Sequence, residues 1–262
     1  MHIGVCHYDK ADFAAALKYF DRASASVSEE KIDKYLPWLW AGRCRNALGE
    51  YVSAAEVLSK ALAERGTKQD GGMIKYQIGL SYQGMGRHRE AVTAFEEAYQ
   101  ESGNAADGGE MKYQAGYSEL ELGEVSRAAE LLKEAVKLDP CRADGYNLLG
   151  KIYMDSGEYE KAESVLKEGI AKAPGGWENY NMLGAVYRGS GDYEKSAATL
   201  KKAIEINPGE WRNYSVLGSV YGKMEKVEEA KRMYERALEL CAEEEYRKKI
   251  KEALNKLKAV KN

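Results

Sequence analysis

The sequence predicts an all-α protein built from about seven helix-turn-helix units, and two regularities indicate this fold. Glycines recur at intervals of 38, 37, 37, 34, 34 and 34 residues, each inside a similar stretch. These ladder glycines are Gly4, Gly42, Gly79, Gly116, Gly150, Gly184 and Gly218. Small residues follow the last three of them at twelve and at nineteen positions, as at Ala162 and Gly169 after Gly150. Self-similarity at a period of this length is typical of stacked helical units.

The spacing inside one unit predicts two helices that cross closely. Tyr146, Gly150 and Tyr153 are separated by four and three residues, so they share one face of a first helix. Ala162 and Gly169 lie seven residues apart and share one face of a second helix. Small residues at a crossing let two helix axes approach, while larger side chains fill the flanks. A single unit cannot bury its apolar face, so stacked neighbours are expected to supply the core.

Turn signals are expected between the two helices of each unit. Gly123, Gly157 and Gly191 each stand seven residues after a ladder glycine, where the first helix must stop. Two further segments, Asp70-Gly71-Gly72 and Asp107-Gly108-Gly109, are expected to be loops before a first helix. There the aspartate would cap the helix and the glycines would loosen the turn.

The pattern resembles the tetratricopeptide repeat. Its features here are a period near 34, a Leu-Gly pair, a downstream tyrosine, two spaced small residues and a closing proline at Pro140, Pro174 and Pro208. The resemblance covers nearly the whole chain. It implies a right-handed α-solenoid superhelix whose first helices line a concave groove. It also implies a non-enzymatic protein-protein interaction scaffold that binds a peptide or helical segment of a partner in that groove.

The units follow one another along the chain with little left over. We expect a partial repeat at 1–28, then repeats at 35–68, 72–105, 109–142, 143–176, 177–210 and 211–244, and a capping helix at 245–262. In the last segment Tyr246, Ile250, Leu254 and Leu257 form one apolar stripe. Lysines lie away from that stripe, so this helix is expected to cover the end of the stack.

Composition indicates a soluble protein without a basic field. The formal net charge is −3 and the isoelectric point is near 5.9, which does not favour nucleic acid as a partner. No apolar run is long enough for a bilayer span, and the N-terminus lacks a basic-then-apolar signal. We therefore expect no membrane insertion and a cytoplasmic location.

The chain offers few groups for catalysis. It has three histidines, none in a metal-ligand pattern, so no cofactor, metal or catalytic residue is expected. Its four cysteines, Cys6, Cys44, Cys141 and Cys241, are scattered without disulfide or zinc spacing. They are interpreted as small core thiols.

The first-helix faces that are not needed for stacking carry the expected partner-binding residues. Side-chain amides can serve the backbone of an extended peptide, and aromatic rings add large contact area. The expected groove residues are Trp40, Arg43, Tyr76, Gln77, Tyr113, Gln114, Tyr117, Asn147, Lys151, Asn181, Arg188 and Arg212. The alternative is that the aromatics only pack between neighbouring first helices and the amides face water.

Two other functions remain open from the sequence. The chain could be the regulatory or substrate-recognition arm of a larger enzyme such as a glycosyltransferase, or a self-assembling structural protein. The first helix is cut short because Gly4 is only the fourth residue. We therefore expect either a longer protein with a helix upstream, or an N-terminal end buried against another molecule, with self-association through that end as one form of this.

Overall fold

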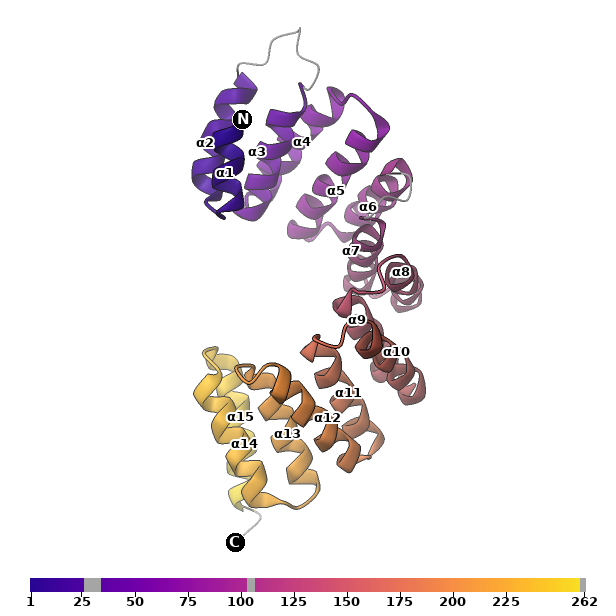
Figure 1. The fold of residues 1–262 in the computed structure, drawn as a ribbon, viewed down its shortest axis with the longest axis vertical. Helices are drawn as coiled ribbons and strands as arrows, with labels where there is room; N and C mark the ends of the chain where they lie inside the picture. The colour runs from indigo at the N-terminus through magenta and orange to yellow at the C-terminus, as the bar shows by residue number, and fades with distance from the viewer. Residues whose placement is uncertain (26–33, 103–106, 260–262) are drawn as a thin grey trace. The chain divides into compact units, whose positions relative to one another are not determined.

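The computed structural model describes residues 1–25, 34–102 and 107–259, with side chains as far as residue 257. These residues form α-helices joined by short turns, and they contain no strand. The all-α repeat fold is therefore confirmed. The chain divides into two compact units, Met1–Asp139 and Pro140–Asn262, which are described separately (Figure 1). The expected boundaries at 28, 105 and 262 lie outside the described residues.

Unit 1 contains four helical pairs. Its helices are α1 (His2–Asp9), α2 (Phe13–Ala25), α3 (Leu36–Ala47), α4 (Tyr51–Ala63), α5 (Lys68–Gly84), α6 (His88–Ser102), α7 (Gly108–Glu121) and α8 (Val125–Leu138). Within the unit, α2, α4 and α6 also pack on the first helix of the next pair. Between α2 and α3, for example, Ala16 and Phe20 share a buried cluster with Ala41 and Cys44. The core of this unit is thus a series of clusters between adjacent helices.

Unit 2 contains three pairs and a final helix. Its helices are α9 (Ala143–Asp155), α10 (Tyr159–Lys172), α11 (Trp177–Ser190), α12 (Tyr193–Ile206), α13 (Trp211–Lys223), α14 (Val227–Leu240) and α15 (Glu244–Ala259). Ile250 and Leu254 of α15 are buried against Tyr234, Ala237 and Cys241. The apolar side of α15 therefore covers the last helical pair. None of the helices in the described ranges combines the length and the apolar character that a bilayer crossing requires.

The ladder glycines stand where the two helices of a pair cross. A Cβ atom built on Gly42 would lie 2.4 Å from the side chain of Leu58, and one built on Gly184 would lie 2.5 Å from Leu200. In every pair the nearest atom belongs to the residue sixteen positions later. At five of the seven positions a methyl group would overlap the partner side chain, and at Gly116 and Gly218 it would make a tight contact at 3.0 and 3.1 Å. The crossing distance therefore favours glycine.

The turn inside each pair needs a left-handed residue seven positions after the ladder glycine. Five of these positions are glycines, including Gly123 with φ +82° and Gly191 with φ +87°. The same position holds Ala11 with φ +57° and Glu225 with φ +60°, the two non-glycine residues at positive φ in the part of the chain that the structure describes. Because L-residues are disfavoured in this region, these two turns are strained relative to the other five.

The prediction of loops at the two Asp-Gly-Gly segments is wrong, because all four glycines lie inside helices α5 and α7. Helix α5 begins at Lys68, where Thr67 and Asp70 form a capping box. A Cβ on Gly72 would meet the Ser102 hydroxyl at 2.4 Å. The glycines are needed for close approach of the helix start to the end of the following helix, which is a packing constraint and not a turn.

The interpretation of the cysteines as core thiols is correct for two of them and wrong for two. Cys44 and Cys241 are buried, whereas Cys6 and Cys141 are exposed. Cys44 packs against α2 of the preceding pair. Cys6 holds the matching position in α1, the first helix of the structure, so it has no such neighbour. Cys141 lies in the turn between α8 and α9.

Candidate partner-binding surface

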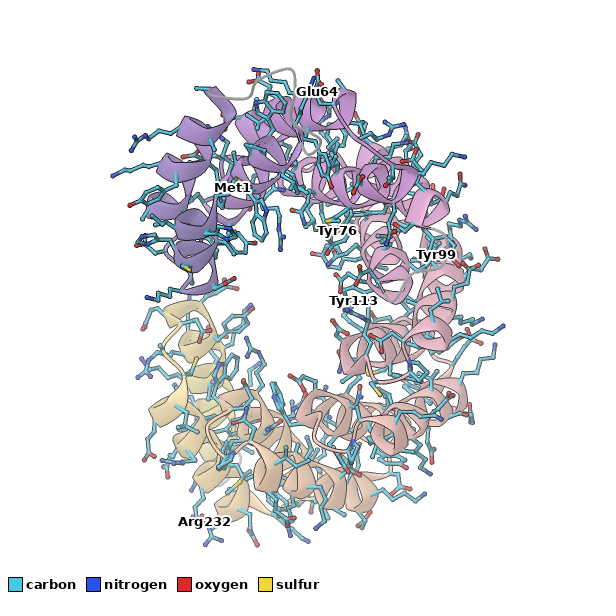
Figure 2. All side chains as sticks on the ribbon, turned by 45° about the horizontal axis from the view of Figure 1, so that its top comes forward. Met1, Glu64, Tyr76, Tyr99, Tyr113 and Arg232 are labelled. Carbon is cyan, nitrogen blue, oxygen red and sulfur yellow. The ribbon has the colours of Figure 1, made fainter. Side chains whose placement is uncertain are left out.

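The first helices of unit 1 form a side that is hollowed by two adjoining cavities. The smaller cavity has a volume of about 520 Å³ and the larger one about 730 Å³. Arg43, Tyr76 and Gln77 line both. Figure 2 shows Tyr76 of α5 and Tyr113 of α7 on this side of the unit, although Tyr113 lines neither cavity. The cavities therefore connect residues from successive repeats into one surface, which we call the unit 1 groove.

The larger cavity is bordered mainly by aromatic and amide side chains. Four tyrosines, Tyr8, Tyr51, Tyr76 and Tyr117, come from four different helices. Its charged residues are Glu121 and Arg43. Rigid aromatic rings with one polar tip combine large contact area with a hydrogen-bonding group. The wall is thus suited to a partner that offers both apolar and polar groups.

Arg43 carries a positive charge into the unit 1 groove on an aromatic support. Its guanidinium carbon lies 4.4 Å from the centre of the Trp40 ring and 4.9 Å from that of Tyr8. The Arg43 Nε is buried without a hydrogen-bond partner, and no carboxylate in the described part of the chain pairs with this residue. Trp40 itself stacks on Phe20, with ring centres 5.6 Å apart. Trp40 therefore supports Arg43 and the core, and does not line either cavity.

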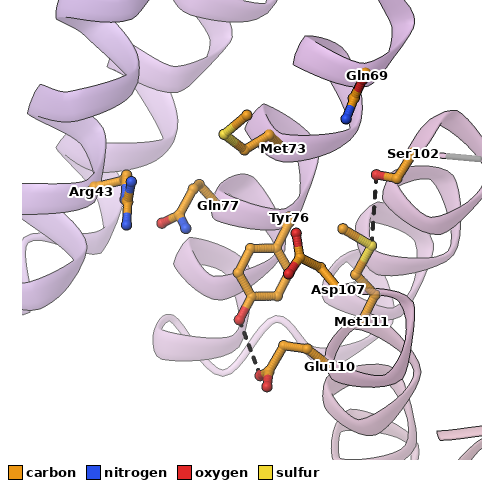
Figure 3. Close-up of a pocket in the computed structure, with 9 residues that line it drawn as sticks. All are labelled: Arg43, Gln69, Met73, Tyr76, Gln77, Ser102, Asp107, Glu110 and Met111. Atoms are coloured by element: carbon orange, nitrogen blue, oxygen red, sulfur yellow. Dashed lines mark hydrogen bonds between the residues drawn. The ribbon is translucent and has the colours of Figure 1, made fainter. Parts of the chain in front are cut away.

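Glu110 organises the smaller cavity, which Figure 3 shows in close-up. Its carboxylate accepts hydrogen bonds from the Tyr76 hydroxyl at 3.1 Å and from the Gln114 amide at 2.8 Å. These bonds join α5 to α7 and orient both side chains. Two of the expected groove residues are thus held in place by a carboxylate that the expected set did not include.

Tyr117 is the more accessible of the expected tyrosines on α7. Its side chain is 36% exposed and borders the larger cavity. Partial burial raises the pKa of its phenol above the ordinary value, and the neighbouring Glu121 carboxylate raises it further. The phenol is therefore uncharged near neutral pH and lies beside the Glu121 carboxylate.

A set of amide and serine side chains that the expectation missed joins neighbouring first helices of unit 1. The Asn46 amide donates to the main-chain carbonyl oxygen of Gln77 at 2.9 Å, and the Ser81 hydroxyl donates to Asn46 Oδ1 at 2.7 Å. An amide–serine pair recurs one repeat later with the opposite direction, since the Gln83 amide donates to the Ser118 hydroxyl at 3.0 Å. The sequence contains a pattern that could have predicted these pairs: an amide stands four residues after one ladder glycine, and a serine stands two residues after the next.

The first helices of unit 2 use their expected groove amides in a similar way. Asn147 donates to the Glu178 carbonyl oxygen at 2.9 Å, and Asn181 donates to Asn213 Oδ1 at 2.8 Å. Asn147 and Asn181 therefore bridge adjacent helices through their NH₂ groups, whatever further role they have toward a partner.

The expected cations of unit 2 differ in what they contact. Lys151 pairs with Asp155 on its own helix at 2.7 Å, and exposed Arg212 pairs with Glu210 at 2.9 Å. Arg188 is half-buried and donates to the Ser219 hydroxyl at 3.1 Å. Exposed pairs such as the first two contribute little and can exchange partners. Arg188 is the one of the three that the fold holds in a set position.

The repeated pairs, with one side hollowed, define a helical-repeat protein, and comparison with known sequences identifies its kind. Three family models, all described as tetratricopeptide repeat, match the chain. One matches residues 4–69 and 76–144, another 119–186, and the third 178–210 and 212–244. The chain belongs to the tetratricopeptide repeat family. No curated protein sequence matches it significantly.

Solved structures with the same fold are numerous. A tetratricopeptide repeat protein from Parabacteroides merdae is 17% identical and covers 98% of this chain and 96% of its own, with a TM-score of 0.68. A thermophilic repeat protein from Thermus thermophilus is 26% identical and covers 71% of this chain and 98% of its own, with a TM-score of 0.55.

A third similar structure is part of an assembly. The APC/C hetero-tetramer Cut9–Hcn1 contains a chain that is 16% identical and covers 92% of this chain and 46% of its own, with a TM-score of 0.65. The family places the chain among protein-interaction scaffolds in the general sense.

Proposed function

We propose that the unit 1 groove binds an extended or helical segment of a partner protein. The observation that carries the proposal is the pair of adjoining cavities with shared walls, lined by side chains from successive first helices. Their volumes, about 520 and 730 Å³, lie in the range typical of ligand-binding clefts, about 300–1,000 Å³. No catalytic role is proposed, because repeats of this family generally act as scaffolds.

The chemistry of the groove favours a protein segment over nucleic acid. Tyrosines supply contact area at low entropic cost, which is typical of residues that dominate interface energies. Glu110 and Glu121 border the cavities beside Arg43, so the surface has no uniform positive field for phosphates. A peptide offers the mixture of donors, acceptors and apolar groups that these walls match.

Site-specific crosslinking tests whether the groove is the contact surface. A photoreactive phenylalanine at Tyr117 is expected to crosslink to the partner in source-cell extract. The matched control is Tyr19 on α2, which is also 36% exposed but lines neither cavity. Equal crosslinking from both positions, or crosslinking from Tyr19 alone, would contradict the proposal.

Removing the α7 tyrosines measures their contribution. The double substitution Tyr113→Ala with Tyr117→Ala is expected to weaken binding of the crosslinked partner by roughly 2 kcal/mol or more, if both rings are anchors. Circular dichroism should show a retained helical fold. A variant that unfolds would assign these rings to the core, and a variant that binds normally would remove them from the site.

A further inference from the structure

We propose that α15 is more than a cover for the last pair: together with α11 and α13 it forms a second binding site, which takes an acidic side chain of a protein partner. The site lies wholly within unit 2 and is separate from the unit 1 groove. A cavity of about 230 Å³ opens between these helices. Its walls include Arg188, Trp211, Ser219, Tyr246, Lys249 and Ile250.

Charge is the first argument for an acidic occupant. Arg188 and Lys249 line the cavity, and none of the lining residues in the described part of the chain is a carboxylate. Two cations facing one small cavity favour a negative group between them. A basic or neutral occupant would leave the charge of Arg188 uncompensated.

Arg188 is the stronger of the two cations as a recognition group. It uses Nη1 to bind the Ser219 hydroxyl, its Nε is buried without a partner, and it has no ion pair within the described ranges. A guanidinium has five N–H donors in a planar fork that matches a carboxylate. The serine bond fixes the orientation of the fork while most of its donors remain unused. A carboxylate would satisfy them with charge-assisted hydrogen bonds.

Lys249 can contribute without disrupting the fold. Its present partner is Glu245, one turn earlier on α15, at 2.6 Å. Both side chains are well exposed, 63% and 74%, so this pair is screened by water and readily exchanged. Lys249 Nζ also lies 5.2 Å from the centre of the Tyr246 ring. The ammonium group is therefore held near the mouth of the cavity and can turn toward an incoming carboxylate.

Two aromatic rings provide the apolar wall. The rings of Trp211 and Tyr246 have centres 5.0 Å apart, although Tyr246 remains 40% exposed. Ile250 and Leu254, which are only 3% and 7% exposed, are the residues of α15 that cover the last helical pair. Tyr246 thus lies at the edge of that contact, beside the cavity. Its ring and that of Trp211 can pack against the methylene groups of a glutamate and the apolar residue next to it.

The test uses the full chain and a labelled peptide as the probe. The probe is an acetylated ten-residue peptide in which glutamates alternate with leucine and phenylalanine, and its control has glutamine at every glutamate. Fluorescence anisotropy should show binding of the acidic peptide and at least tenfold weaker binding of the glutamine peptide. Arg188→Gln keeps an amide for Ser219 but removes the charge, and it should weaken binding of the acidic peptide at least tenfold.

Three controls separate this site from other sources of binding. Arg232→Gln, at an exposed arginine of α14 that lines none of the cavities described above (Figure 2), should leave the affinity unchanged. Tyr117→Ala should also leave it unchanged, because that residue belongs to the unit 1 groove. Inorganic phosphate at millimolar concentration should compete no better than chloride of equal ionic strength.

Several results would overturn the proposal. Equal affinity for the two peptides, no binding of the acidic peptide, or equal losses from Arg188→Gln and Arg232→Gln would exclude specific recognition of a carboxylate at α15. Displacement by phosphate would assign the cavity to a phosphate group instead. Loss of binding through Tyr117→Ala but not Arg188→Gln would place the acidic peptide in unit 1, which leaves the function proposed there intact.

Discussion

Units 1 and 2 repeat the same helical pair but join neighbouring first helices differently. At two junctions of unit 1 the position four residues after the ladder glycine is Asn46 or Gln83, and each is hydrogen-bonded to a buried serine of the next first helix. At the matching positions of the junction between α9 and α11 in unit 2, Met154 and Val186 lie in one apolar cluster. The same site in the repeat therefore accepts either a polar pair or an apolar pair.

This difference shows that the repeat requires matched partners at the junction, not a particular chemistry. A buried hydroxyl or amide costs about 1–3 kcal/mol when its partner is removed. Replacing both members by apolar groups of similar shape can be nearly neutral. A buried amide or hydroxyl left without its partner is thus the disfavoured combination, and the comparison predicts where single substitutions will be costly.

The largest expected effect is the difference in thiol reactivity within each unit. Cys6 in unit 1 and Cys141 in unit 2 are exposed, while Cys44 and Cys241 are buried. Burial raises the pKa of Cys44 to about 11 from 9.0, which alone lowers its thiolate population about 100-fold near neutral pH. Iodoacetamide followed by peptide mass spectrometry should label Cys6 and Cys141 at least 100-fold faster than Cys44, and also faster than Cys241. Rapid labelling of Cys44 or Cys241 in buffer would show that its unit opens readily.

Exchange of junction residues between the units is expected to have the next largest effect. Ser81→Val alone leaves Asn46 Oδ1 without the hydroxyl donor and should lower the free energy of unfolding by about 2 kcal/mol. Adding Asn46→Met, which reproduces the pair of unit 2, should recover about half of that loss or more. Urea unfolding of both single variants and the double variant gives the coupling energy of the pair by a double-mutant cycle. Strictly additive losses would contradict the requirement for matched partners.

Two buried asparagines of unit 2 test the same argument inside one unit. Asn179 and Asn213 are both 0% exposed and hold the same position in successive first helices. Asn213 accepts from Asn181, whereas neither amide atom of Asn179 has a partner among the described residues. Asn213→Ala should cost about 1 kcal/mol more than Asn179→Ala in thermal or urea unfolding. Equal costs would mean that the Asn181 bond adds no net stability.

The smallest expected effects concern the left-handed turns, where each unit has one non-glycine residue. Ala11→Gly in unit 1 and Glu225→Gly in unit 2 should each raise the free energy of unfolding by about 0.5–1 kcal/mol, because glycine removes the strain at positive φ. The reverse change, Gly191→Ala, should lower it by a similar amount. Destabilisation by Glu225→Gly would show that the glutamate side chain contributes more than its backbone costs.

Local patterns in the sequence determined the repeat. The ladder glycines, the turn glycines and the small residues of the second helices recur at set intervals, because each satisfies a constraint within one helical pair. Gly42 must clear Leu58 in the same pair, and Gly123 must adopt a positive φ in its own turn. The stripe of Ile250 and Leu254 was equally readable, since helical periodicity is a local property.

Only the tertiary structure decided how side chains from different pairs meet. It placed Gly72 inside a helix against Ser102, left Cys6 exposed, and brought Asn46 and Ser81 into hydrogen-bond contact. It also brought Arg188 and Lys249 to one cavity, although 61 residues separate them in the sequence. The physical reason is that these relations depend on the packing angle and offset between helices, which no periodicity along a single helix specifies.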